Sequence, residues 1–195
     1  MRELPASGLI SPDLPPVPIL PVRWGVVGAG DFARGFILPA MRSIRHIEIT
    51  AVHRRQGAAA ADTAEAFGAK RACTRVEALL KEKNLEAVFV ATPTAQHEAD
   101  VIAAAAAGKR WILCAPPLAV SAAAAQRMLA ACAQHDAHLF VAHSLRHRDA
   151  VEKLRRLIAA GELGDIRALH AHANAPAERA VSGTAGGETA AGRAA

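Results

Sequence analysis

Arg23-Trp-Gly-Val-Val-Gly-Ala-Gly-Asp-Phe-Ala-Arg34 is the stretch that decides the fold of this 195-residue chain. A short apolar strand breaks at a glycine pair and gives way to a helical pattern. Gly28 permits the tight turn, and Gly30 lets the backbone approach a pyrophosphate. Ala33 is small enough for the new helix to pack closely on the strand. The stretch therefore predicts a strand, a phosphate-binding turn and a helix in succession.

The helix after this turn is expected over residues 32–41. Its first N–H groups have no partner inside the helix, and the helix dipole places partial positive charge at the same end. Asp31 and Phe32 stand where these groups would face the phosphates of a dinucleotide. Any tight strand-to-helix turn favours glycine, however, so this motif alone leaves a purely structural turn as an equal alternative.

Short apolar segments and helical patterns alternate along the rest of the chain. Strands are expected over 22–27, 47–52, 87–91, 111–114 and 138–142, with a last strand beginning near Ile166. Further helices are expected over 58–67, 75–83, 96–107, 121–134 and 149–160. Strands separated by helices of about 10–15 residues favour right-handed βαβ units. The expected fold class is therefore α/β, a doubly wound parallel sheet of the Rossmann type.

Composition divides the chain into four segments. Residues 1–21 are a Pro-rich extension expected to be disordered, because each proline removes a backbone donor and favours extended geometry. Residues 22–144 are expected to form the Rossmann domain, and residues 145–173 the beginning of a second, truncated α/β domain. Residues 174–195 are mainly small and polar. This tail buries too little surface to offset its chain entropy, so disorder is expected there too.

Charge and cysteine content exclude several classes of protein. The net charge of +5 comes from scattered arginines without a basic run, so a solvated surface is favoured over nucleic-acid binding. Three cysteines without C-x-x-C spacing indicate reduced thiols in a cytoplasmic protein, rather than a disulfide scaffold or a zinc site. No segment has the pattern of a signal peptide or of a membrane span, so no membrane partner is expected.

The histidines of the chain do not have the spacing of a metal site. Five of them lack carboxylates at ligand spacing, and no metal is expected: His135, His138, His147, His170 and His172. Ser144 is not surrounded by the G-x-S-x-G pattern, which argues against a hydrolase nucleophile. The glycine turn is therefore the feature on which a functional hypothesis depends.

Four further segments carry a resemblance to a known family. Ala87-Val-Phe-Val-Ala-Thr-Pro-Thr-Ala-Gln-His97 resembles its strand-and-loop motif, and Ala107-Gly-Lys109 resembles the entry into its next strand. Val141–Arg146 and Leu157–Ile166 match the segments where the family crosses into its second domain. With the glycine stretch, these segments make residues 22–172 similar to the Gfo/Idh/MocA family of NAD(P)-dependent oxidoreductases.

This resemblance implies a Rossmann domain that holds NAD(P), and a second domain that forms the substrate pocket and the dimer interface. It implies hydride transfer between nicotinamide and a sugar or polyol carbon, and association between copies of the chain. Thr92, Pro93 and His97 take positions beside the cofactor, with His97 near the nicotinamide. Arg146 takes a position near the substrate. The alternatives are a His97 bonded only to local backbone and an Arg146 on a solvated turn.

The chain departs from the family where the family has Glu-Lys-Pro. Leu113-Cys-Ala-Pro-Pro-Leu118 stands there, and the lysine position falls on Ala115 or Pro116, neither of which carries a proton. Lys109 is expected at the opposite end of its strand, about 20 Å away. A positioned proton donor contributes typically about 10²–10⁴-fold in rate. His143, at the same edge of the sheet as the ligand, is the expected alternative proton carrier.

A second departure is that little sequence follows Gly164, so the family's substrate domain has no counterpart in this chain. Turnover is therefore expected to be impaired. Two alternatives to an oxidoreductase stay open. One is a dinucleotide-binding module without catalysis. The other is a fragment that folds poorly and exposes apolar surface.

The choice between NAD and NADP depends on the corner after the second strand, Ala51-Val-His-Arg-Arg55. A NAD site has an acidic residue there, about 20 positions past the glycines, which bonds the ribose 2′-hydroxyl. No carboxylate stands at this corner, and Glu48 falls too early in the strand. Arg54 and Arg55 can hold a 2′-phosphate, so NADP is favoured over NAD. The alternative is that both arginines belong to a solvated turn.

Overall fold

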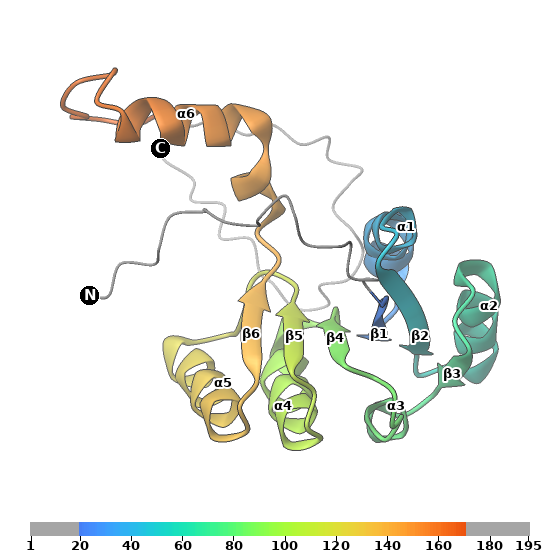
Figure 1. Ribbon diagram of the computed structural model, residues 1–195. Coiled ribbons are helices and arrows are strands. Elements are labelled where there is room, and N and C mark those ends of the chain that lie inside the picture. The colour runs from blue at the N-terminus through green and yellow to red at the C-terminus, as the bar shows by residue number, and fades with distance from the viewer. Residues whose placement is uncertain (1–19, 171–195) are drawn as a thin grey trace, which may run out of the picture.

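Six parallel strands form one sheet in the order β3-β2-β1-β4-β5-β6 (Figure 1). This computed structural model describes residues 20–170. The strands are β1 (Val22–Val27), β2 (Ile47–His53), β3 (Arg71–Cys73), β4 (Ala87–Val90), β5 (Trp111–Cys114) and β6 (His138–Val141). The chain winds outward from β1 to β3 and then returns to build β4 to β6 on the other side of β1. The expected doubly wound Rossmann sheet is confirmed.

Helices connect successive strands and cover the two faces of the sheet. They are the π-helix η1 (Ala33–Ile37), α1 (Leu38–Ser43), α2 (Gly57–Phe67), α3 (Val76–Leu80), α4 (Thr94–Ala106), α5 (Ala122–Gln134), the 3-10 helix η2 (Ser144–His147) and α6 (Asp149–Ala159). Two of the expected helix boundaries have their predicted physical cause. Gly68 ends α2 in the left-handed conformation, at φ 70°. The Ser121 hydroxyl accepts a hydrogen bond from the Ala124 amide at the start of α5.

Two apolar clusters hold the layers together, one on each face of the sheet. On one face, Val88 and Ile112 of the sheet pack with Met128 of α5 and with residues of α3 and α4. On the other face, Val26 and Phe89 pack with residues of α1 and α2. The second cluster is centred on β1 and β2. Towards β5 and β6 the same face is open, because no helix among residues 20–170 packs there.

The helix expected over residues 32–41 differs from a regular α-helix. Its first turns are π-helical, and the α-helix α1 begins only at Leu38. Pro39 gives a physical reason, because proline has no N–H to donate and its ring collides with the carbonyl four residues earlier. A wider turn before a proline removes that collision, and kinks at π-turns are a common solution.

Two elements were not predicted, and one further expectation was wrong. The strand Arg71–Cys73 was not predicted, because three residues with two exposed members give almost no periodic signal. The segment after His143 forms η2 before α6 begins. No strand begins near Ile166, because residues 165–170 have no regular structure.

The predicted segment boundaries extend beyond the described part of the chain. The Pro-rich extension (apart from Leu20 and Pro21) and the tail over 174–195 lie outside the described residues, as does His172. Within 145–170, α6 extends past the carboxyl end of β6 (Figure 1) and leaves Val151, Leu154 and Ile158 exposed. None of the helices described in residues 20–170 combines the length and the hydropathy needed to span a bilayer.

Candidate functional site

The candidate site lies at the carboxyl ends of β1, β2 and β4. In open α/β sheets, ligands bind outside this edge at the point where the strand order reverses. That point here is between β1 and β4, which pair directly. The turn that begins at Gly28 follows β1 at this position. The fold therefore places the glycine stretch at the expected ligand edge.

Gly28 is required by its backbone and by its packing. Its φ is +79°, a conformation that costs other residues free energy. A Cβ at this position would lie 2.6 Å from the Thr92 backbone nitrogen and 2.8 Å from the Thr92 Cα. The turn therefore passes directly against the chain that leaves β4, and only glycine permits that approach.

Gly30 differs from Gly28, because the space beside it is open. Among residues 20–170, and apart from the adjoining residues, only the Gly28 carbonyl oxygen comes within 4 Å of a Cβ placed there, at 4.0 Å. Ala29 and Ala33 are buried on either side, at 0% and 1% exposure. The turn thus packs on the sheet through its alanines and leaves a free surface at Gly30. This open backbone surface, which we call the cradle, permits the close approach of a pyrophosphate to Gly30.

His53, the last residue of β2, fixes the back of the turn. The Gly28 amide donates to His53 Nδ1 at 3.2 Å, and the Ala29 amide donates to the His53 carbonyl oxygen at 2.9 Å. The ring is buried, and this burial lowers the pKa of His53 below its ordinary value. His53 was not predicted as a site residue. The available signal was its place at the end of β2, in the corner where a NAD site has a carboxylate.

Arg54 and Arg55 follow His53 directly and leave the sheet at the same edge. Arg54 is half-buried, and its Nη1 donates to the Thr63 hydroxyl of α2 at 3.3 Å. Arg55 is exposed. Glu48, by contrast, is at the other end of β2, where Lys70 Nζ lies 2.6 Å from its carboxylate. The corner therefore presents one guanidinium group that is bonded to Thr63 and one that is exposed.

The loop after β4 brings a buried polar pair to the same edge. The Thr92 hydroxyl donates to Asp100 Oδ2 at 2.6 Å, and both side chains are buried. Burial raises the pKa of the Asp100 carboxyl, although the Thr92 hydrogen bond and the nearby His53 and His97 oppose that shift. Pro93 is exposed at the head of α4.

His97 joins this loop to the loop after β5. Its Nε2 lies 2.7 Å from the Thr92 carbonyl oxygen, and its Nδ1 lies 3.1 Å from the carbonyl oxygens of both Pro117 and Leu118. The ring is 1% exposed. Carbonyl oxygens only accept hydrogen bonds, so either ring nitrogen donates when it carries a hydrogen. This geometry makes His97 a clamp between two loops of the site, the one after β4 and the one after β5.

The loop that His97 holds contains both positions where the resemblance places a lysine. Ala115 is buried, and Pro116 is exposed. Neither side chain can transfer a proton. Cys114 precedes them, but burial and the nearby Asp100 raise the pKa of its thiol to about 12. At neutral pH this thiol stays protonated, so it cannot replace the lysine as a base.

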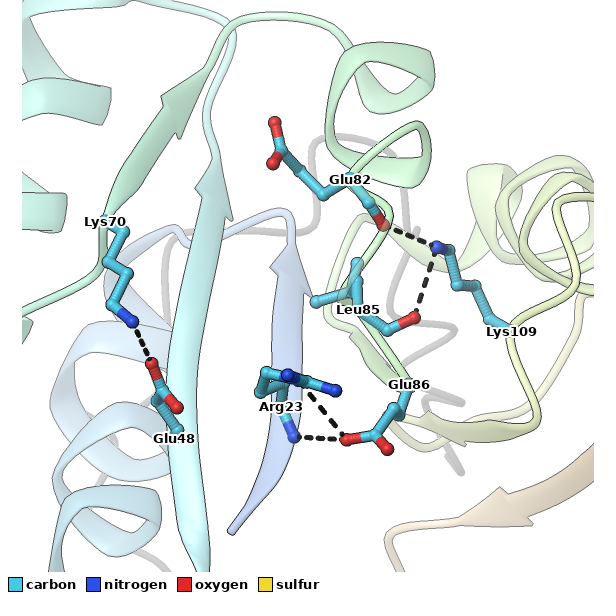
Figure 2. Close-up of polar contacts among 7 residues, drawn as sticks. All are labelled: Arg23, Glu48, Lys70, Glu82, Leu85, Glu86 and Lys109. Carbon is cyan, nitrogen blue, oxygen red and sulfur yellow. Dashed lines mark hydrogen bonds and ion pairs between the residues drawn. The ribbon is translucent and has the colours of Figure 1, made fainter. Parts of the chain in front are cut away.

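Lys109 is confirmed at the opposite edge of the sheet. Its Nζ donates to the carbonyl oxygens of Glu82 and Leu85, at 3.0 and 3.2 Å. Figure 2 shows this contact beside the pairs Arg23–Glu86 and Lys70–Glu48. Burial lowers the pKa of Lys109, and its ammonium group is held between the two backbone oxygens. Lys109 is therefore a structural residue of the amino-terminal edge.

His143 and Arg146 lie at the far end of the carboxyl edge. His143 follows β6, and Arg146 belongs to η2; both are exposed. His143 borders an open hollow of about 530 Å³ on the uncovered face of β5 and β6. Its other lining residues include Trp24, Trp111 and Phe140. In strand order β6 is three places from β1, so His143 and Arg146 are not packed against the glycine turn.

Within residues 20–170, no group of three or more potential ligand side chains could hold a metal ion. The three cysteines are free and buried. The polar groups that the structure gathers at the carboxyl edge are therefore backbone amides, imidazoles, guanidinium groups and one buried carboxyl. Such a set can bind and orient an anionic ligand through hydrogen bonds and positive charge.

Comparison with known proteins gives the same picture. Residues 22–143 match the sequence model of an oxidoreductase family, GFO_IDH_MocA, described as having a NAD-binding Rossmann fold. Mouse trans-1,2-dihydrobenzene-1,2-diol dehydrogenase is 34% identical over 152 residues, which are 77% of this chain and 45% of that protein. The dTDP-3,4-didehydro-2,6-dideoxy-alpha-D-glucose 3-reductase of Streptomyces violaceoruber is 35% identical over 158 residues, 80% of this chain and 45% of that protein.

A solved structure is also similar. KijD10, a 3-ketoreductase from Actinomadura kijaniata solved in complex with NADP, superposes with a TM-score of 0.69 at 28% sequence identity. The match covers 75% of this chain and 46% of KijD10. The chain thus spans a little under half the length of the curated relatives that it matches. The shared part contains the whole six-stranded sheet and the glycine turn.

Proposed function

Because this chain belongs to the Gfo/Idh/MocA oxidoreductase family, we propose that it binds a nicotinamide dinucleotide and serves hydride transfer with a sugar-like or diol-like substrate. The observation that carries the proposal is the difference between the two glycines. Gly28 is packed against β4, whereas Gly30 is beside open space. The open space beside Gly30 leaves the backbone of the turn accessible to a pyrophosphate at the ligand edge of the sheet.

The residues proposed to hold the dinucleotide surround this turn. The amides at the head of the helix take the pyrophosphate, since helix N-termini bind anions. Thr92 and Pro93 line the neighbouring loop, and His97 fixes that loop against the next one. The proposed set is Gly28, Gly30, Asp31, Phe32, Ala33, Arg54, Arg55, Thr92, Pro93 and His97. The bound nicotinamide supplies or accepts the hydride.

NADP is the proposed cofactor in preference to NAD. No carboxylate follows β2 to bond a ribose 2′-hydroxyl, and two guanidinium groups stand there instead. Arg55 is exposed and free to pair with a 2′-phosphate, while Arg54 is oriented by Thr63. Charge-assisted bonds from arginine to phosphate are among the stronger hydrogen bonds in proteins.

The proposed substrate carries a hydroxyl or keto group on a ring carbon. The names of the relatives support this class, since they are a dihydrobenzene-diol dehydrogenase, a reductase of a dTDP-linked sugar and a ketoreductase. Arg146 is proposed to orient the substrate oxygen, and His143 to carry its proton in place of the lysine. We also propose that copies of the chain associate, and that the protein is cytoplasmic.

A second function is favoured by one observation. Both positions for the proton-transferring lysine hold residues without a titratable group, while the cofactor turn is complete. This combination suits a module that binds the dinucleotide without turning over a substrate. Turnover and binding therefore have to be measured separately.

Isothermal titration with NADPH and NADH tests the proposal. The full chain should bind NADPH more tightly than NADH, and Gly30→Trp should abolish binding because its indole fills the open space beside the turn. Gly35→Trp is the matched control, since nothing lies within 4 Å of a Cβ at Gly35 either. If the folded wild-type chain binds neither dinucleotide, the proposed function is wrong. Binding without oxidation of NADPH by ketose or diketone probes would favour the non-catalytic module.

A further inference from the structure

We propose that His53 is a positioning residue of the dinucleotide site: its neutral ring and its carbonyl together hold the Gly28–Ala29 turn in the form that receives the pyrophosphate. This inference rests on the proposed function of the turn. The role is exerted through the turn and not by contact with the reacting atoms.

Two consecutive amides of the turn end on this one residue. The Gly28 amide donates to the ring Nδ1 at 3.2 Å, and the Ala29 amide donates to the carbonyl oxygen at 2.9 Å. The Gly30 amide bonds back to the Gly28 carbonyl oxygen at 2.7 Å. The Gly28 and Ala29 amides, at the back of the turn, therefore have their hydrogen-bond partners on β2 and are not available to a ligand. The amides that remain directed at a ligand are those at the head of the helix, beginning at Asp31.

The Gly28 bond requires a ring without a hydrogen on Nδ1. A backbone N–H only donates, so Nδ1 must accept, and the ring must be neutral with its hydrogen on Nε2. Protonation would place two N–H groups against each other at 3.2 Å. The ring is 6% exposed, so water cannot easily take over the freed Gly28 amide. A buried donor without a partner costs free energy. The turn would therefore shift until the Gly28 amide finds another acceptor.

The charged groups around the ring come from several elements. Asp100 on α4 and Glu77 on α3 favour the protonated ring, as does a backbone hydrogen bond at Thr74 after β3. Arg55 opposes protonation, and burial opposes it most strongly. The balance lowers the pKa of His53 below the ordinary value of about 6.5. The ring is therefore neutral at pH 7, and the turn loses its support only on acidification through that lowered pKa.

Two substitutions test whether the turn depends on a hydrogen-bond acceptor at the position of His53 Nδ1 or on the imidazole ring as a whole. Asn places Oδ1 where Nδ1 stands and does not titrate, so His53→Asn should bind NADH nearly as wild type does. His53→Leu fills the space but leaves the Gly28 amide without an acceptor. Its affinity for NADH should fall about tenfold, the factor that corresponds to 1.4 kcal/mol. Circular dichroism and urea unfolding identify any variant that fails to fold.

The pH dependence of NADH affinity distinguishes this role from simple packing, because a side chain that only fills space would not change it. NADH is the probe, because phosphate monoesters such as the 2′-phosphate of NADPH titrate near pH 6 themselves. As the pH is lowered from about 7.5 until the His53 ring itself titrates (followed by its NMR signals), wild-type affinity should fall while that of His53→Asn stays flat. Equal profiles for the two proteins would overturn the proposal, as would a folded His53→Leu that binds like wild type. Wild-type affinity that rises on acidification would mean that the ring acts as a cation, which also overturns it.

A measurement without ligand distinguishes this inference from the proposed function. In ¹⁵N-labelled protein, the His53 ring should be the Nε2–H tautomer, and the Gly28 amide resonance should move with the titration of that ring. His53→Asn should abolish the movement. If these signals agree but no dinucleotide binds, the proposed function fails and the hydrogen bond stands. If the Gly28 amide resonance does not move with the titration of the ring, the positioning role is wrong, whether or not a dinucleotide binds.

Discussion

The glycine turn after β1 and the loop after β5 lie at the same edge of one sheet. They differ in whether they retain the residues that their proposed roles require. The turn has a glycine that its packing requires, a second glycine beside open space, and two amides held by His53. The loop over 114–118 is equally well held, through His97, but carries no group that can transfer a proton near neutral pH. Binding and proton transfer are thus separable parts of this site.

The loop over 114–118 is therefore well ordered without being able to transfer a proton. His97 bonds the loop through its backbone carbonyls, so the hydrogen bonds are indifferent to the side chains at Ala115 and Pro116. The turn, by contrast, depends on the absence of a side chain at Gly28. Substitutions in the turn should therefore affect folding or binding directly, whereas the loop tolerates the loss of its lysine without losing its shape.

The largest expected effect is the contrast between the two glycines. Gly28→Ala should destabilise the protein by about 3 kcal/mol, since it combines a left-handed backbone with a collision against Thr92. Gly30→Ala should leave the free energy of unfolding nearly unchanged and weaken only dinucleotide binding. Urea unfolding measures the first effect and calorimetric titration the second. Equal destabilisation by both substitutions would remove the distinction between a packed glycine and a cradle.

Breaking the clamp between the two loops should have the next largest effect. His97→Leu removes the ring nitrogens that lie within hydrogen-bond distance of the Thr92, Pro117 and Leu118 carbonyl oxygens, and should cost about 2 kcal/mol of stability. Hydrogen exchange should show both loops opening together in the variant. Lys109→Met is the control, because it also frees two buried carbonyls but at the opposite edge. If the control opens the same loops, His97 is not their specific link.

Cofactor preference should respond to a single guanidinium group. Arg55→Ala should weaken NADPH binding about tenfold, because one charge-assisted bond to the 2′-phosphate is lost. NADH binding should be unchanged. Arg45→Ala, an equally exposed arginine before β2, should alter neither ligand. A parallel loss for NADPH and NADH would place Arg55 elsewhere on the cofactor.

The smallest expected effect concerns the buried Asp100 carboxyl. Its pKa is raised in the folded protein, so the folded state holds this proton more tightly than the unfolded chain does. Wild-type stability should therefore decline as pH rises through the unfolded value of about 4 and level off above the raised value. Asp100→Asn keeps an acceptor for the Thr92 hydroxyl and removes that decline. Urea midpoints at pH 4 and pH 7 measure it; a wild-type gain toward pH 7 relative to the variant would contradict the sign.

Local pattern was enough to predict most of the fold. The βαβ alternation, the glycine turn and the Gly68 helix end all follow from residues close together in the sequence. The π-helix before Pro39 and the strand Arg71–Cys73 did not follow, since one depends on a local collision and the other on a three-residue pairing at the sheet edge. Neither changes the fold class, which was predicted correctly as a doubly wound parallel sheet.

The contacts of the site were harder to predict than its location. His53 was missed because its ring meets Gly28, which lies 25 positions earlier in the chain. The clamp of His97 on Pro117 and Leu118 spans 20 and 21 positions. Such contacts arise only when neighbouring strands bring their ends together, so the sequence indicated the edge of the sheet but not the partners within it.

Chemical-shift mapping with NADPH is the sharpest test of a dinucleotide site at the glycine turn, because it shows where a ligand binds as well as whether it binds. Added to the ¹⁵N-labelled full chain, NADPH should shift the amide signals of Gly30 to Ala33 and of Arg55 in a saturable way. The signals of Glu82 and Lys109, at the opposite edge, should not move. Saturable shifts confined to other residues, or none in a folded chain, would contradict a dinucleotide site at the glycine turn.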